Sequence, residues 1–260
     1  FWRLYRPFPF LDRRDTREKS AKWELKIRRP IYPELDSKHF TREDQIDECI
    51  WMMGLTFQAI TFWVLAPVSS YAQWLFDQDR NKYYQEYLLL LKAQQCCVPD
   101  TRLVLKAPDH TPYLDIILSL IPNARILQLH RDPAQCMISL CSLFYSTQCS
   151  LTNKINPKKI AEINKEMYTF YLQENKRICK DPSVNGSVFD IQYEDLTTKP
   201  IKTIKQIYES FDVRWTNQYE EKLKAFIKQH PKNKHGRHNY SPEQFGQSYR
   251  DLTEHFEKII

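Results

Sequence analysis

The chain has 260 residues, of which 42% are hydrophobic and 27% are charged. This composition is ordinary for a folded globular protein and excludes a disordered chain. The net charge of +6 suits an anionic ligand but is too small for a dedicated nucleic-acid-binding protein. Only four glycines are present, so the sequence contains neither a GxGxxG nor a GxxxxGK phosphate loop.

The N-terminal segment, residues 1–40, is rich in arginine, proline and aromatic residues and begins with Phe1 rather than Met. Its prolines predict an extended, irregular segment that lies over the core. The seven cysteines of the chain show no CxxC pair. This pattern favours scattered thiols in a reducing compartment over a disulfide framework.

An uncharged run, Cys49–Ala66, is long enough to span a membrane if it forms one helix. The polar Gln58 within it, the helix-breaking Pro67 after it and the lack of a flanking basic cluster favour a buried helix instead. We therefore expect a soluble helix over residues 41–65, capped by Thr41, and argue against a membrane partner. A second amphipathic helix is expected over residues 79–95.

The remainder of the chain alternates between apolar strand patterns and helical patterns. Strands are predicted at Arg102–Lys106, Ala124–Leu129 and Val188–Gln192. Helices are predicted over residues 112–121, 133–148, 157–180, 200–211 and 216–230. This alternation indicates a single α/β domain over residues 1–260, with a mainly parallel central sheet flanked by helices.

Ligands of open parallel sheets lie at the carboxyl ends of the strands, where this sequence has KAPDH, HRDP and YEDL. Arg131 ends one strand, and Ser139 follows two turns into the next helix. The guanidinium, the hydroxyl and the helix N-terminus could together hold a phosphate. The alternative is a local ion pair between Arg131 and Asp132 that fixes the turn.

Two further segments carry chemistry. Lys106 at a strand end could neutralise developing negative charge, and His110 could accept a proton. The alternatives are a surface lysine and a locally hydrogen-bonded histidine. Residues 232–246 concentrate basic side chains around Gly236, where the backbone can approach an anion closely. Here the alternative is a solvated basic loop.

Taken in order, LKAPDH, IPNARILQLHRDP with the later Ser139, YEDL and KHGRHNYSPEQFG resemble the sulfotransferase family, in its broad bacterial, protist and invertebrate branch. The resemblance runs from about residue 1 to the C-terminus. It implies a P-loop-kinase-like sulfotransferase fold. It also implies transfer of a sulfuryl group from 3′-phosphoadenosine 5′-phosphosulfate (PAPS) to a hydroxyl or amine, without a metal.

On the nucleotide side, the resemblance implies that Arg131 and Ser139 hold the 3′-phosphate of PAPS or of adenosine 3′,5′-bisphosphate, and that Tyr193 lies beside the adenine. The late basic loop would close over the same nucleotide, through Lys234, Gly236, Arg237 and His238.

The resemblance assigns residues 41–95 to the acceptor side. It implies that Glu48 in this region, and His39 just before it, contact the acceptor. It places Lys106 near the transferring sulfuryl group and makes His110 the general base. The acceptor itself is left open by the sequence.

The sequence departs from the family in one respect. The 5′-phosphosulfate loop of the GxPRSGTT or PKSGTTW type is absent, and FWRLYRPFPF resembles the stretch that follows it. The missing first strand belongs in the middle of the sheet, so its loss would expose the neighbouring strands. Two functions remain: an active sulfotransferase whose loop precedes Phe1, or an inactive sulfotransferase-like structural subunit with protein partners in a larger assembly.

Overall fold

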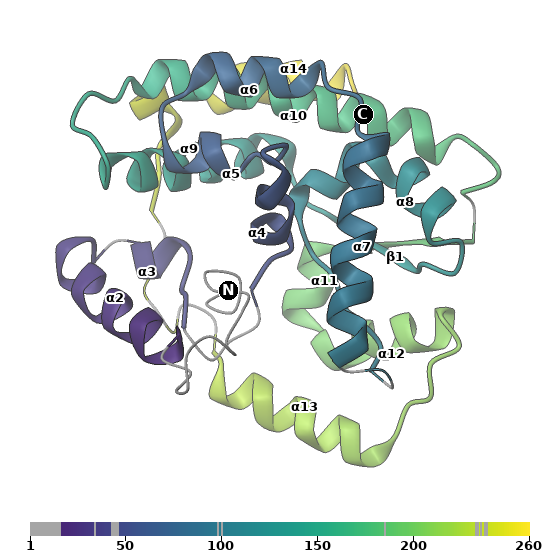
Figure 1. Ribbon diagram of the computed structural model, residues 1–260. Coiled ribbons are helices and arrows are strands. Elements are labelled where there is room, and N and C mark those ends of the chain that lie inside the picture. Colours follow the sequence, from purple (N-terminus) through teal and green to yellow (C-terminus); the bar gives the residue numbers. More distant parts are fainter. Residues whose placement is uncertain are drawn as a thin grey trace.

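The computed structural model describes residues 17–33, 35–42, 47–97, 99, 101–184, 186–231, 234, 236 and 239–260. Helices form most of this part of the chain and surround a small parallel sheet (Figure 1). The helices are α2 Arg17–Ile31, α3 Leu35–Lys38, α4 Ile50–Met53, η2 Gly54–Thr56, α5 Thr61–Leu65, α6 Ser69–Phe76, α7 Asn81–Cys97, η3 Pro108–Tyr113, α8 Leu114–Leu120, α9 Pro133–Cys149, α10 Pro157–Cys179, α11 Tyr193–Thr198, α12 Pro200–Ser210, α13 Asn217–Gln229, η4 Pro242–Phe245 and α14 Tyr249–Glu257.

The sheet of the described residues consists of β1 Ile126–His130 and β2 Val188–Gln192, which pair in parallel. The prediction for β2 is confirmed, and β1 begins two residues later than predicted. The register pairs Leu127 with Phe189 and Leu129 with Ile191. Because both strands run in the same direction, their carboxyl ends, and the residues that follow them, lie at one edge.

The strand predicted at Arg102–Lys106 does not form. A strand needs a hydrogen-bonded neighbour, whereas the Lys106 carbonyl accepts from the Cys49 amide (2.8 Å) and no ladder reaches this segment among the described residues. Its Val104 side chain is 87% exposed, and Leu127 and Leu129 of β1 are 46% and 47% exposed. Apolar residues in strand-like patterns are therefore exposed both in this segment and on β1.

The helical core is built on α9 and α10, which run next to each other (Figure 1). Each begins with the same local signal: a side-chain N-cap, Asp132 or Asn156, followed by a proline at the first helical position. Their facing sides bury mainly aliphatic residues together with α5, α6 and α14. This packing fixes the direction in which α9 leaves β1.

The single helix predicted over residues 41–65 is wrong. Instead, η2 follows α4 directly, and a break at residues 57–60 separates η2 from α5. Phe57 adopts a left-handed φ of 58° in this break. Side chains distant in sequence hold this break: Arg80 donates to the Gln58 carbonyl, and Asp109 accepts from the Ile60 amide (3.0 Å). No helix of the described residues is long and apolar enough to cross a membrane.

The extended segment predicted over residues 1–40 is also wrong in part, because α2 and α3 occupy much of it. Between Pro9 and Pro30 the sequence contains no proline and many strong helix formers, so α2 forms up to its last turn. Residues 1–16 lie outside the described part.

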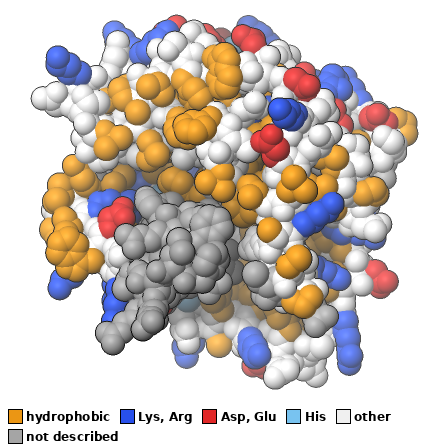
Figure 2. Space-filling model, viewed as in Figure 1, with side chains coloured by type: hydrophobic (Ala, Val, Ile, Leu, Met, Phe, Trp, Pro, Cys, Tyr) orange, Lys and Arg blue, Asp and Glu red, His pale blue; other side chains and the backbone are white. Residues whose placement is uncertain are grey.

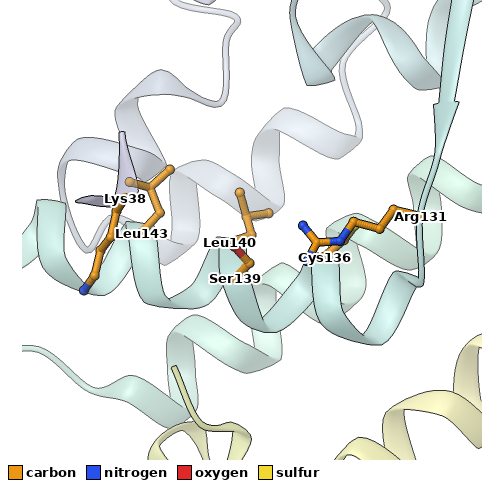
Figure 3. A pocket seen from close by; sticks show the side chains of 6 residues that line it. All are labelled: Lys38, Arg131, Cys136, Ser139, Leu140 and Leu143. Atoms are coloured by element: carbon orange, nitrogen blue, oxygen red, sulfur yellow. The ribbon is translucent and has the colours of Figure 1, made fainter. Parts of the chain in front are cut away.

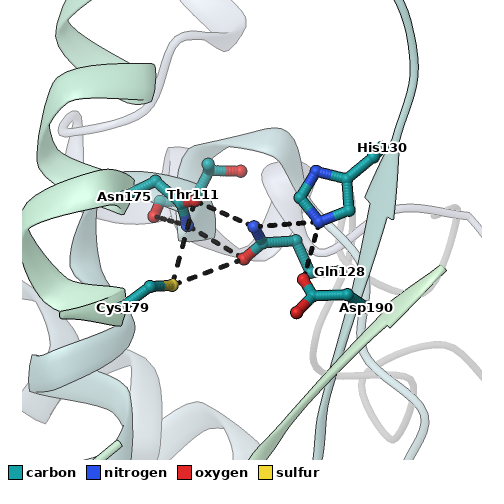
Figure 4. A network of polar contacts seen from close by, with 6 residues as sticks. All are labelled: Thr111, Gln128, His130, Asn175, Cys179 and Asp190. Atoms are coloured by element: carbon teal, nitrogen blue, oxygen red, sulfur yellow. Dashed lines mark hydrogen bonds and ion pairs between the residues drawn. The ribbon is translucent and has the colours of Figure 1, made fainter. Parts of the chain in front are cut away.

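A polar network joins β1 to α10 (Figure 4). The amides of Gln128 and Asn175 exchange two hydrogen bonds of 2.9 Å, and Asn175 also donates to the Thr111 carbonyl. Beside them, His130 pairs with Asp190 of β2 at 2.6 Å. These bonds fix the sheet against the helical layer, so the residue that follows His130 has a defined position.

Candidate functional site

A cavity of about 180 Å³ opens beside α9, and both residues predicted to hold a phosphate line it (Figure 3). Arg131 follows β1 directly, and Ser139 lies two turns into α9. The described residues that line it are Lys38, Arg131, Cys136, Ser139, Leu140 and Leu143. The strand–turn–helix sequence thus delivers a guanidinium and a hydroxyl to one concave surface.

The Arg131 guanidinium is held by groups that leave its charge unneutralised. Its Cζ lies 4.8 Å from the centre of the Tyr193 ring, and its Nη2 is 3.4 Å from the Gln135 side-chain oxygen. Among the described residues no ion pair joins Arg131 to a carboxylate. The alternative of an Arg131–Asp132 pair therefore does not describe this turn.

Asp132 has a different role: its carboxylate caps α9. It accepts from the amides of Ala134 (2.8 Å) and Gln135 (3.3 Å). The first-turn amides that the sequence suggested for phosphate binding are thus already occupied. An anion in this cavity would be bound along the side of α9 and not at its N-terminus.

Tyr193 begins α11 directly after β2, so the two parallel strands bring Arg131 and Tyr193 into contact. The stacking of a guanidinium on a phenol ring gives a cation–π interaction and orients the guanidinium. The predicted place of Tyr193 beside an adenine stays a prediction.

The late basic loop reaches the same region through Gly236. This glycine has a φ of +101°, and a Cβ added to it would lie 3.3 Å from the Cβ of Ser37 in α3. Glycine is needed there for both the backbone conformation and the close approach. Lys234 lies in an exposed turn of this loop, whereas Arg237 and His238 fall outside the described residues.

Lys38, the residue after Ser37, is a cavity residue that the sequence reading missed. Its ammonium donates to the Ser146 hydroxyl of α9. Lys38, at the carboxyl end of α3, thus lines the cavity, while its ammonium points away from Arg131 and Ser139 (Figure 3). No spacing in the sequence connects Lys38 with Arg131, because only the packing of α3 on α9 brings them together.

A second cluster joins Lys106, Glu48 and His39. The Lys106 ammonium forms an ion pair with the Glu48 carboxylate, and His39 Nε2 lies 3.8 Å from the same oxygen, Oε1. Two hydrogen bonds hold the segments together: the Cys49 amide donates to the Lys106 carbonyl, and the Lys106 amide donates to the Cys49 sulfur. The structure thus places a predicted catalytic lysine beside both predicted acceptor-side residues.

The charges of this cluster support one another. Burial alone would raise the pKa of Glu48, but hydrogen bonds from His39 and Lys106 outweigh burial and hold that pKa below its usual value. The hydrogen bond to Glu48 raises the pKa of His39, against the lowering effect of burial. The cluster therefore favours a charged carboxylate between two nitrogen groups.

His110 lies elsewhere, in an aromatic environment. Its Nδ1 is 3.0 Å from the Tyr84 hydroxyl, and its ring centre is 5.6 Å from that of Tyr87. Burial lowers the pKa of His110 to about 4, and its buried Nε2 has no hydrogen-bond partner among the described residues. With Nε2 buried and Nδ1 facing the Tyr84 hydroxyl, this half-buried imidazole is poorly placed to reach a substrate proton.

Beside His110, Asp109 was not singled out by the sequence reading. It is fully buried and accepts from the Tyr171 hydroxyl (2.7 Å) and the Ile60 amide (3.0 Å). The carboxylate thus ties the KAPDH turn to α5 and α10. Among the described residues no group of three His, Cys, Asp or Glu side chains could hold a metal ion.

The arrangement defines an α/β protein in which functional side chains gather at the carboxyl edge of parallel strands. Residues 2–217 match the model of the sulfotransferase family. This chain belongs to that family.

Two solved structures share the fold. They are the sulfotransferase STF1 from Mycobacterium tuberculosis H37Rv, at 23% identity and a TM-score of 0.77, and the sulfotransferase STF9 from Mycobacterium avium, at 22% identity and a TM-score of 0.77. The alignments cover 92% and 99% of this chain but 62% and 67% of those proteins. The predicted sulfotransferase fold is confirmed. No curated protein sequence matches the chain.

Proposed function

We propose that this chain binds the 3′-phosphate of PAPS in the cavity beside α9 and transfers a sulfuryl group to a hydroxyl or amine. One observation carries the proposal: Arg131 and Ser139, eight residues apart in sequence, line one cavity, and no carboxylate of the described residues pairs with the guanidinium. An open anion-binding cavity supports a nucleotide-binding enzyme, since a purely structural subunit has no need of one.

The cavity residues fit a phosphate monoester. The Arg131 guanidinium offers paired donors and Ser139 offers a hydroxyl, and Lys38 adds positive charge at the far end of the same cavity. Tyr193 would hold the guanidinium in place and present its ring toward the adenine of the nucleotide. Gly236 would let the basic loop approach the same ligand. The bound donor would supply the sulfuryl group.

Proton transfer would fall to the second cluster. The His39 imidazole, whose pKa is raised by Glu48, would accept the proton of the acceptor, with the Glu48 carboxylate as its hydrogen-bonded partner. Lys106 would place a positive charge beside the reacting atoms. This assignment is supported by the contacts among the three side chains and by their exposure, since Lys106 is 68% and His39 is 40% exposed. His110 would support the KAPDH turn from inside.

Isothermal titration with adenosine 3′,5′-bisphosphate and with adenosine 3′-monophosphate tests the nucleotide site, because both ligands carry the 3′-phosphate. Loss of a charge-assisted hydrogen bond predicts that Arg131→Ala weakens binding by about tenfold or more. Ser139→Ala should weaken it less. The matched control is Arg125→Ala, since Arg125 is an exposed arginine at the amino end of β1.

Adenosine 5′-monophosphate, which lacks the 3′-phosphate, should bind wild type and Arg131→Ala equally. Absence of binding by the wild-type protein, or equal loss in Arg131→Ala and Arg125→Ala, would refute the proposed nucleotide site.

The second cluster is tested by the NMR titration of His39. Because Glu48 raises the pKa of His39 and Lys106 lowers it, Glu48→Gln should lower that pKa and Lys106→Gln should raise it. The opposite signs are the test, because a general loss of structure would shift both variants in the same direction. An unchanged pKa in both variants would contradict the cluster.

A further inference from the structure

Helix α2 carries an exposed apolar row. Trp23, Ile27 and Ile31 are 68%, 44% and 58% exposed. Their spacing of four residues places them on one side of a helix. Figure 2 shows hydrophobic side chains at the edge of the molecule where Figure 1 places α2, with basic side chains close by. A contiguous apolar row on a surface helix marks an interaction surface.

The helix that carries the row has an excess of positive charge. The fifteen residues of α2 include six Lys or Arg and two Glu, a net charge of +4 in a chain whose total is +6. At 100° per residue, Lys19 and Lys26 flank one side of the row and Glu24 flanks the other, and all three are exposed. The partner that fits this surface therefore offers an apolar layer to the row and anionic groups to the two lysines.

The helix is held on the body of the protein by its opposite side. Leu25 is buried, Arg29 pairs with Asp36 of α3 at 2.9 Å, and Arg29 also donates to the Thr41 carbonyl (2.9 Å). These contacts leave the apolar row pointing outward. A partner that encloses the whole helix in a groove would have to break these contacts. A partner with a flat surface can reach the row without breaking them.

We propose that α2 docks this protein on an anionic phospholipid surface. Trp23, Ile27 and Ile31 would enter the boundary between headgroups and acyl chains, and Lys19 and Lys26 would contact the phosphates and carboxylates of the lipids. Tryptophan suits this boundary because its ring is apolar and its N–H is polar. This is peripheral binding by a surface helix and differs from the membrane span considered for Cys49–Ala66.

The test is sedimentation of the protein with vesicles of equimolar phosphatidylcholine and phosphatidylserine, and with vesicles of phosphatidylcholine alone. The wild-type protein should bind the first far more strongly than the second, and added salt should weaken that binding. Trp23→Ala should reduce partitioning by about tenfold. The double variant Lys19→Gln and Lys26→Gln should reduce it by about fivefold for each lysine removed.

Matched controls come from other helices. Trp74 is 43% exposed on α6, a helix without a basic residue, so Trp74→Ala should leave partitioning unchanged. Lys202→Gln with Lys205→Gln on α12 removes the same charge from two exposed positions elsewhere. Circular dichroism checks that each variant is folded. Binding of adenosine 3′,5′-bisphosphate should not change in any of them, because α2 does not line the nucleotide cavity.

Three results would overturn the proposal. The first is equal binding of the wild-type protein to both kinds of vesicle. The second is an equal effect of Trp23→Ala and Trp74→Ala. The third comes from analytical ultracentrifugation: a dimer that Trp23→Ala dissociates would assign the row to a second copy of the chain.

Discussion

Substitution of His110 by phenylalanine tests whether this side chain serves the chemistry or the fold. His110 packs against the rings of Tyr84 and Tyr87, with ring centres 5.8 Å and 5.6 Å away. A phenyl ring fills a similar space and cannot titrate. The exchange removes the hydrogen bond to the Tyr84 hydroxyl, which keeps the Asp109 carbonyl (3.3 Å) as a partner.

The expected effect follows from the pKa. Burial lowers the pKa of His110 from 6.5 to about 4. Between these two pKa values, His110 is protonated in the unfolded state but not in the folded state. The free energy of unfolding is therefore highest above pH 6.5, the unfolded-state pKa of His110, and it decreases as the pH falls toward the folded-state pKa of about 4. With about 1.4 kcal/mol per pKa unit, His110 lowers the free energy of unfolding by about 2 kcal/mol between about pH 7.5 and about pH 5.

Urea unfolding followed by circular dichroism measures this free energy at both pH values. Near neutral pH, His110→Phe should match the wild-type protein within about 1 kcal/mol, because the packing is kept. At about pH 5 the variant should be the more stable protein by about 2 kcal/mol. Other titrating groups are common to both proteins, so the difference between them isolates His110.

A difference between the two proteins that does not change with pH would refute the buried, neutral His110. NMR titration of His110 with a midpoint near 6.5 would do the same. Such an imidazole would again be a candidate for the general base.

Two further predictions concern the turn and the loop around the site. Asp109→Ala should lower the free energy of unfolding by about 3 kcal/mol in urea, because the amide of Ile60 and the hydroxyl of Tyr171 lose a buried acceptor; a loss below about 1 kcal/mol would contradict this role. Gly236→Ala should weaken the binding of adenosine 3′,5′-bisphosphate in titration calorimetry, because its Cβ would press on Ser37. Gly186→Ala is the control, because that glycine also has a positive φ (88°) but nothing lies within 4 Å of an added Cβ. Equal affinities of the two variants for adenosine 3′,5′-bisphosphate would disprove the loop's contact with the site.

Local signals in the sequence were enough to predict much of the fold and half of the site. Asp132 with Pro133, and Asn156 with Pro157, define the starts of α9 and α10, because a cap and a first-turn proline act within a few residues. The place of Arg131 after a strand and Ser139 in the next helix follows from the same local order. Their common cavity was therefore predictable before any contact was known.

The tertiary structure decided what depends on distant partners. Arg102–Lys106 has a strand pattern but no neighbouring strand among the described residues, and strand formation requires one. The helix predicted over residues 41–65 is interrupted where Arg80 donates to the Gln58 carbonyl and Asp109 accepts from the Ile60 amide, and local propensity does not register such distant partners.

The site shows the same division. Lys106 and Glu48 are 58 residues apart, and hydrogen bonds between Cys49 and Lys106 bring their segments together. Lys38 reaches the cavity because α3 packs on α9. Sequence by itself determined which side chains follow each strand, since that order is covalent. Which of them meet depends on packing between segments distant in sequence, because only burial and long-range hydrogen bonds select one arrangement.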